Sequence, residues 1–175
     1  MCPLYSAVPI VLRTLSKAFA LAGLRCGFTL ANSDVIEMLS KVIAPYPISA
    51  PVAEIASSAL QTQNLTVMNS RVSSTNILAE ELSQWLAQQS WCIKVFPTNA
   101  NFVLFKTSHK DFIFNLLLEQ NILIRDQSKQ QQLEDCLRIS IGSEAELTSL
   151  KQVIEAGFSS SASTLTKDSK EVSEK

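Results

Sequence analysis

A helical pattern of apolar residues runs without interruption from residue 65 to about residue 88 and restricts the fold of this chain more than any other feature. No glycine or proline breaks the pattern, so we expect one long helix here. A helix of this length suits a rigid connector between two lobes, although a plain core helix of the second lobe fits nearly as well. The apolar positions are Leu65, Met68, Val72, Leu78, Leu82, Trp85 and Leu86.

The chain after this helix has the pattern of a small α/β domain. Ser108 is expected to begin a helix, and Ser143 with Glu146 forms a capping box at the start of a last helix. Beyond Phe158 the residues are mostly Ser, Thr, Lys and Glu, which bury little, so we expect a disordered tail. The strand-like stretches are residues 93–96, 101–105, 122–125 and 137–141.

The chain before the long helix predicts part of a sheet. Residues 8–12 have the apolar character of a buried parallel strand, although the proline among them cannot donate to a central ladder. Residues 24–31 are expected to return as a second strand. Residues 34–43 and 52–60 have helical spacing and lie on either side of a proline-rich loop around Tyr46.

Lys17 stands in the middle of an apolar, small-residue run at residues 11–28. Apolar surroundings disfavour a charged ammonium, and a neutral lysine amine attacks carbonyl carbons. Thr14, Ser16 and Arg25 add hydroxyl donors and a planar guanidinium, which suit a phosphate group. An aldehyde and a phosphate together describe pyridoxal phosphate. A lysine whose stem packs at the end of a core segment explains the same spacing equally well.

Arg138 lies in the centre of an apolar, β-branched stretch. Strand alternation puts Leu137, Ile139 and Ile141 on one face and leaves Arg138 and Ser140 on the other. An arginine in this position is costly unless an anion meets it. We therefore expect either a structural salt bridge to a carboxylate or a binding site for an anionic ligand.

The overall charge indicates which partners to expect. A net charge of −1 gives no electrostatic reason to expect nucleic-acid or membrane binding. The four cysteines have neither metal-site nor disulfide-framework spacing, and the single histidine, His109, falls among polar residues. No apolar run approaches the ~20 residues of a membrane helix, and the chain does not open with a basic leader. We expect a cytoplasmic protein that uses single arginines to bind small molecules and holds no metal.

Several blocks of sequence resemble a known family. Residues 14–19 and 23–27 are similar to the cofactor-lysine signature of fold-type I, pyridoxal-phosphate-dependent class II aminotransferases. Further blocks are closer still to the histidinol-phosphate aminotransferase branch of that family, and the resemblance extends from about Val8 to about Phe158. These further blocks are residues 29–32, 41–48, 124–127 and 136–142.

The resemblance implies an α/β fold. It implies the C-terminal part of a pyridoxal-phosphate-dependent transferase large domain, with a partial, mostly parallel sheet and helices, followed by a small C-terminal α/β domain. The expected division is a large-domain remnant at residues 1–64, a connecting helix at 65–90, the small domain at 91–158 and a disordered tail at 159–175.

The resemblance also assigns roles to residues. Lys17 would hold pyridoxal 5′-phosphate and act in catalysis, with Thr14, Ser16 and Arg25 as further cofactor ligands. The substrate ligands would be Arg138, Arg125 and Tyr46, although a loop-packing role suits Tyr46 equally well. The implied substrates are histidinol phosphate and the pair glutamate and 2-oxoglutarate, and the family is homodimeric.

The sequence departs from the family in one respect. The family places roughly half of its chain before this lysine, including the residues that hold the cofactor phosphate, stack on its ring and pair with its pyridine nitrogen. None of them can be matched before Val8. Three hypotheses therefore stay open: the C-terminal portion of a histidinol-phosphate aminotransferase, a catalytically inactive fragment that needs an N-terminal half, and an aromatic amino acid aminotransferase.

Overall fold

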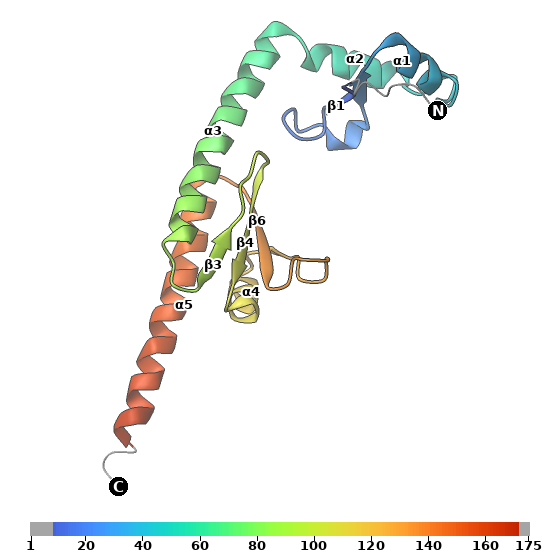
Figure 1. The fold of residues 1–175 in the computed structure, drawn as a ribbon. Coiled ribbons are helices and arrows are strands. Elements are labelled where there is room, and N and C mark those ends of the chain that lie inside the picture. Colours follow the sequence, from blue (N-terminus) through green and yellow to red (C-terminus); the bar gives the residue numbers. More distant parts are fainter. Residues whose placement is uncertain (1–8, 172–175) are drawn as a thin grey trace, which may run out of the picture. The chain divides into compact units, whose positions relative to one another are not determined.

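The computed structural model describes residues 9–171, with side chains described as far as residue 160. The chain divides into two compact units, and the boundary between Ser73 and Ser74 falls inside the long helix α3. Figure 1 shows the elements in sequence colours. In chain order they are β1 (Val11–Thr14), the 3-10 helix η1 (Ala22–Leu24), β2 (Gly27–Leu30), α1 (Ser33–Ser40), α2 (Ala50–Ala59), α3 (Thr62–Ala87), β3 (Cys92–Val95), β4 (Phe102–Thr107), α4 (Lys110–Glu119), β5 (Arg125–Asp126), β6 (Cys136–Ser140) and α5 (Glu144–Glu171).

The first unit contains a two-stranded sheet in which β1 pairs with β2. The strands are antiparallel, with Val11 opposite Leu30 and Thr14 opposite Gly27. Glycine is required at position 27, because a Cβ atom there would lie 2.8 Å from the carbonyl oxygen of Arg13. The expected buried parallel strand is therefore wrong. The connection from β1 to β2 contains a short 3-10 helix and no crossover α-helix, so the chain returns antiparallel.

Helices α1 and α2 complete the first unit. Asn32 caps α1, since its side-chain oxygen accepts a hydrogen bond of 3.1 Å from the Val35 N–H. Pro51 lies in the first turn of α2, where its missing N–H has no helical partner to lose. Among the described residues of this unit, the buried apolar side chains are those of Leu15 and Ala56. Large apolar side chains that remain exposed include those of Leu12, Phe28, Leu30, Met38, Val42 and Ile43.

The second unit is built on a four-stranded antiparallel sheet in the order β3-β4-β6-β5. Alternate residues of β4 and β6 are buried, so one face of this sheet packs against helices and the other stays open. Full burial of a Val, Leu, Ile or Phe side chain stabilises a fold by roughly 1.5–3 kcal/mol. The core includes Val103, Phe105, Leu137 and Ile139 from the sheet, Leu82 and Leu86 from α3, Ile113 and Leu117 from α4, and Leu147, Leu150 and Ile154 from α5.

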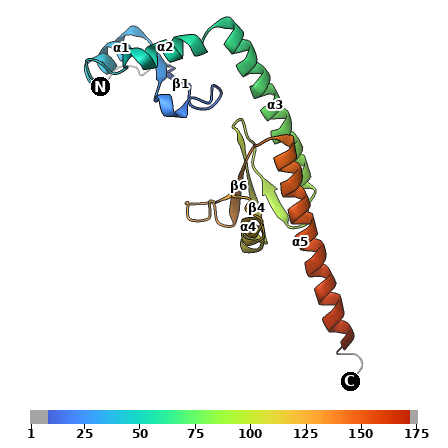
Figure 2. The same cartoon turned by 180° about the vertical axis from the view of Figure 1, so that it is seen from behind.

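Helices α3 and α5 lie side by side in both views of the second unit (Figures 1 and 2). The indole N–H of Trp85 on α3 donates a hydrogen bond of 3.0 Å to the Glu155 carboxylate on α5. The rings of Trp91 and Phe158 stack with their centroids 5.4 Å apart. These contacts fasten α5 to the core up to Phe158.

The sequence predicted much of this arrangement. The α/β class is confirmed, and the long helix is present as α3. The capping box also forms, since the Ser143 N–H donates to Glu146 Oε2 at 2.7 Å. The expectation of a mostly parallel sheet is wrong, because every pairing among the strands of residues 9–171 is antiparallel. The predicted strand at residues 122–125 is reduced to the two residues of β5.

The C-terminal helix extends further than the sequence suggested. Helix α5 continues to Glu171, although the tail was expected to be disordered from residue 159 onwards. A helix propagates through its own backbone hydrogen bonds, and neither glycine nor proline follows Phe158. Residues 172–175 of that predicted tail lie outside the described residues. Within the described chain, no helix combines the length and the apolar character needed to cross a membrane.

Candidate functional site

The two predicted cofactor hydroxyls lie together at the end of β1. The Oγ1 of Thr14, the last residue of the strand, lies 2.8 Å from the Oγ of Ser16. The same Oγ1 accepts the Ser16 N–H at 3.1 Å and donates to the Cys26 carbonyl oxygen at 3.3 Å. Leu15, which is buried, anchors the turn between them. The structure therefore presents Thr14 and Ser16 as a hydrogen-bonded pair of hydroxyls.

Lys17 follows this pair directly and is exposed. The apolar surroundings expected around its side chain are not formed by the described residues, because Leu15 takes the buried position in this turn. The Ala20 N–H donates to the Lys17 carbonyl oxygen at 2.9 Å, which closes the next turn. No carboxylate in residues 9–160, whose side chains the structure describes, forms an ion pair with Lys17. The amine is thus open to a ligand.

Arg25 lies between η1 and β2 in a left-handed backbone conformation, with φ 52° and ψ 33°. A residue other than glycine costs about 1 kcal/mol or more in this region. The side chain of Arg25 makes few packing contacts that could offset this cost. Its side chain is exposed, and one guanidinium nitrogen donates to the Ala22 carbonyl oxygen at 3.2 Å. This position is the C-cap of η1, where a left-handed residue commonly ends a helix, and four other non-glycine residues of the described chain also have positive φ.

Tyr46 lies in the loop between α1 and α2 and is 93% exposed. A side chain so exposed packs neither into the loop nor against Lys17 or Arg25. The structure thus gathers Thr14, Ser16 and Lys17 on one turn and leaves Tyr46 apart from them.

Arg138 and Arg125 lie opposite each other on the neighbouring strands β6 and β5. Residues paired in this way point to the same face of the sheet. The pairing of Arg138 with Leu104 identifies this as the open face, since the buried residues of β4 alternate with Leu104. The structure therefore places two arginine side chains next to each other.

The Arg138 guanidinium has an aromatic contact but no carboxylate. Its Cζ lies 4.8 Å from the ring centroid of Phe102, in cation–π contact. Its Nε is buried and has no hydrogen-bond partner among the described residues. Neither Arg138 nor Arg125 forms an ion pair with the side chains described, those of residues 9–160. The salt-bridge interpretation of Arg138 is thus not borne out among these residues. The two guanidinium groups are instead available to donate hydrogen bonds to a phosphate or carboxylate.

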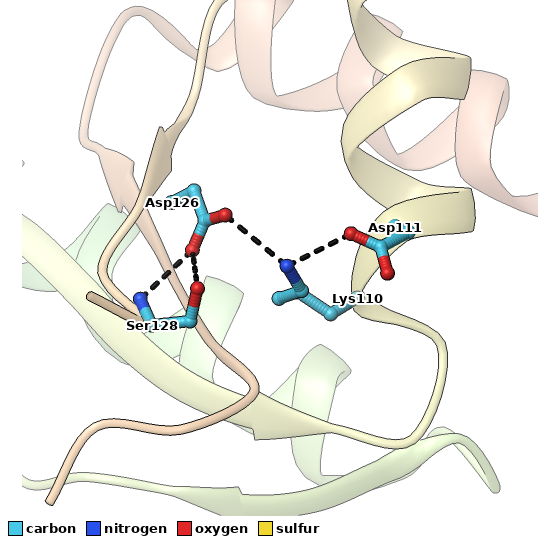
Figure 3. A network of polar contacts seen from close by, with 4 residues as sticks. All are labelled: Lys110, Asp111, Asp126 and Ser128. Carbon is cyan, nitrogen blue, oxygen red and sulfur yellow. Dashed lines mark hydrogen bonds and ion pairs between the residues drawn. The ribbon is translucent and has the colours of Figure 1, made fainter.

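A polar network surrounds Asp126, the chain neighbour of Arg125 in β5, and is drawn in Figure 3. The Lys110 ammonium, at the start of α4, lies 3.2 Å from the Asp126 carboxylate of β5 and 2.8 Å from that of Asp111. The other Asp126 oxygen accepts hydrogen bonds from the hydroxyl and the N–H of Ser128. The Ser128 bonds, followed by that of Lys110, lower the pKa of Asp126, while hydrogen bonds to Asp111 and Asp126 raise the pKa of Lys110.

The cysteine thiols and surface hollows add no further candidate. Burial raises the pKa of the Cys92 and Cys136 thiols, which makes them poor nucleophiles. Two open hollows lie in the first unit, with volumes of about 310 and 450 Å³. Their linings are mainly apolar and include neither Lys17 nor Arg25. Neither of these hollows therefore encloses the lysine.

Sequence reasoning missed three features of the site. The register of β5 against β6 makes Arg125 a direct neighbour of Arg138, and nothing local in the sequence specifies that register. The contact between Phe102 and the Arg138 guanidinium depends on the pairing of β4 with β6 in the same sheet. The Asp126 network had one local signal, the Asp-x-Ser spacing that favours a side-chain turn.

Comparison with known proteins gives a consistent result. A family model described as "Aminotransferase class I and II" matches residues 4–154. The histidinol-phosphate aminotransferase of Colwellia psychrerythraea (strain 34H) is 69% identical over 149 residues, which are 83% of this chain and 40% of that protein. The chain thus spans about two fifths of the length of this curated relative.

Two solved structures share the fold. L-threonine-O-3-phosphate decarboxylase from Porphyromonas gingivalis matches with a TM-score of 0.71 at 22% identity, over 86% of this chain and 46% of that chain. Histidinol-phosphate aminotransferase from Sinorhizobium meliloti, in complex with pyridoxal-5′-phosphate, matches with a TM-score of 0.63 at 23% identity, over 84% and 41%. The family model covers most of the sequence, and the chain belongs to the aminotransferase class I and II family.

Proposed function

We propose that this chain carries the lysine and the anion-binding arginines of a histidinol-phosphate aminotransferase. The reaction converts L-histidinol phosphate and 2-oxoglutarate to imidazole-acetol phosphate and L-glutamate, in histidine biosynthesis. The observation that carries the proposal is the pair Arg125 and Arg138, which share one sheet face without a described carboxylate partner. Both reaction partners are anionic, and a guanidinium binds phosphate and carboxylate alike. The name of the 69% identical relative supports this substrate class.

The first unit fits pyridoxal phosphate chemically. Lys17 offers an accessible amine for the aldehyde, and the hydroxyls of Thr14 and Ser16 with the Arg25 guanidinium offer donors for the phosphate. When bound, this cofactor supplies the electron sink for transamination. Lys17 Nζ would hold the aldehyde and, once released by the amino substrate, move the proton that leaves the substrate Cα. Arg138 and Arg125 would fix the substrate by its anionic group, with Tyr46 as a further contact.

The proposal extends to the organisation of the protein. Residues 1–64 would belong to a cofactor-binding large domain, residues 65–90 would connect it, and residues 91–158 would form the small domain. We place the enzyme in the cytoplasm as a homodimer, as the family resemblance implies.

A second candidate is a form of this chain without activity of its own. The exposure of Lys17 and of apolar side chains on β1, β2 and α1 favours it, because a transaminase excludes water from its reacting atoms. An aromatic amino acid aminotransferase is a third candidate that the arginine pair alone does not exclude. Comparing turnover of histidinol phosphate and phenylalanine, after addition of an N-terminal half from a relative, distinguishes these two substrate classes.

The direct test is reductive labelling. The chain is mixed with pyridoxal phosphate and reduced with borohydride, and the pyridoxyl group is located by peptide mass spectrometry. We expect label at Lys17, strongly reduced by Arg25→Ala, while Lys41→Ala serves as a matched control because Lys41 is another exposed lysine of the same unit. Sparse label spread evenly over surface lysines would show that Lys17 has no cofactor site here and would favour the inactive form.

A further inference from the structure

The arginine pair sits on a weak part of the sheet. β5 contains only Arg125 and Asp126 and forms an edge of the sheet. Beyond its pairing with β6, the Gln127 N–H donates to the Cys136 carbonyl oxygen at 2.9 Å. Like charges directly opposite each other on neighbouring strands are destabilising, so Arg125 and Arg138 push β5 away from β6. Another interaction must oppose this repulsion.

The opposing interaction lies on the other face of the same strand. Asp126 pairs with the buried Leu137, so its carboxylate points to the face that the helices cover. There it is joined to Lys110 of α4 and to Ser128, as described above (Figure 3). The side chains of Lys110 and Asp126 are 18% and 30% exposed, so solvent screens this pair less than a fully exposed one.

Lys110 belongs to α4, a helix that is packed into the core. Ile113 and Leu117 of the same helix are fully buried in the core of the second unit. Lys110 therefore links the edge strand to a helix that is itself fixed by packing. In this way the core determines the position of Asp126 and of its chain neighbour Arg125.

We propose that Lys110, Asp126 and Ser128 are positioning residues that hold Arg125 opposite Arg138, so that both guanidinium groups bind one substrate anion together. This inference rests on the proposed function, because it takes the arginine pair as the substrate anion site. The bound anion, through Arg125, and the network of Lys110, Asp126 and Ser128 would both act on β5. By linkage, a bound anion that neutralises the arginine pair also stabilises the β5–β6 pairing.

The test uses the 175-residue chain with inorganic phosphate as the probe. Phosphate affinity is measured by titration calorimetry, and exchange of the Gln127 amide by NMR reports the pairing of β5 directly. We expect Lys110→Met to weaken phosphate binding about tenfold and to speed Gln127 exchange. Lys110→Arg should restore both, because it keeps the charge and can reach the same carboxylate.

The matched control is Lys41→Met. It also removes one positive charge, together with the exposed ion pair of 2.9 Å between Lys41 and Glu37. Phosphate affinity and Gln127 exchange should match those of the wild-type chain. An equal loss in Lys41→Met would attribute the effect to net charge and overturn the inference.

The remaining outcomes separate this inference from the proposed function. If wild-type phosphate binding is intact and Lys110→Met leaves it unchanged, positioning by Lys110 is refuted and the anion site stands. If the wild-type chain binds no phosphate, or Arg138→Ala leaves its affinity unaltered, both ideas fail. Should near-UV circular dichroism show that Lys110→Met is unfolded, Ser128→Ala takes its place. It removes a single hydroxyl donor and must weaken phosphate binding in the same direction, and an unchanged affinity there overturns the inference.

Discussion

The turn that carries Lys17 and the inner strand that carries Arg138 are built in opposite ways. Lys17 stands exposed on a turn held by local hydrogen bonds, with Leu15 as the buried anchor of that turn. Arg138 lies on a strand whose flanking residues, Leu137 and Ile139, belong to a packed core. The core of the second unit therefore fixes the strand that carries Arg138, whereas the amine of Lys17 in the first unit is exposed.

The difference shows which half of the chemistry this chain can support. In the proposed function, recognition of the anion falls to the guanidinium groups of Arg125 and Arg138 in the second unit. Transamination also needs a site shielded from water, and the described residues do not supply that around Lys17. Changes to the core and changes to the turn should accordingly have separate effects.

Phe105→Ala should have the largest effect. Phe105 is fully buried in the second unit, and truncation of a buried Phe costs about 3–5 kcal/mol. Both tryptophans, Trp85 and Trp91, belong to the same unit, so denaturant unfolding followed by tryptophan fluorescence measures the loss. Leu12→Ala, at a site that is 74% exposed, should shift the midpoint little. A comparable loss in both variants would contradict the contrast between the units.

Arg138→Ala should come next. Loss of charge-assisted hydrogen bonds to a bound anion costs about 1.5–3 kcal/mol, so phosphate affinity should fall tenfold or more in a titration. Arg138→Lys should recover only part of this, because an ammonium lacks the planar fork. Full recovery by Lys would show that charge alone determines binding.

Arg25→Gly sharpens the comparison from the side of the turn. Glycine adopts the left-handed conformation of residue 25 freely, so the first unit should gain up to about 1 kcal/mol of stability. The same change should reduce pyridoxyl labelling of Lys17, since a phosphate donor is lost. Thermal unfolding by far-UV circular dichroism and labelling yield are the two measurements. A variant that is destabilised, or that labels like the wild-type chain, would count against a binding role for the strained residue.

The smallest effect should be seen in acid. The pKa of Asp126 in the folded chain lies below its ordinary value, which is about 3.9. Its stabilising contribution is therefore complete above that value and is lost as the pH falls through the folded pKa. Acid unfolding followed by fluorescence should show a steeper decline below about pH 4 in the wild-type chain than in Asp126→Asn. Identical slopes would mean that the network adds no stability.

What the sequence could predict follows from the range of each interaction. The capping box of Ser143 and Glu146 and the long helix α3 depend on residues within a few positions of one another, so the local pattern was sufficient. The alternation that separates Arg138 from Leu137 and Ile139 is equally local. The hydroxyls of Thr14 and Ser16 are two positions apart and lie within hydrogen-bond distance of each other, while their role towards a phosphate stays a prediction.

The features that escaped prediction are set by distant contacts. Nothing near Arg125 specifies that it faces Arg138, because the register arises from packing across the whole sheet. The apolar run around Lys17 suggested burial, yet burial requires other segments to cover it, and among the described residues only Leu15 of that turn is covered. The antiparallel return of β2 was missed because apolar composition alone does not specify strand direction.

In the proposed anion site, the cross-strand arginine pair would also make binding depend on the charge state of the ligand. A dianion relieves the repulsion between the two guanidinium groups more fully than a monoanion. A phosphomonoester gains its second charge near pH 6, so the pair should discriminate between the two ionisation states of one phosphorylated substrate.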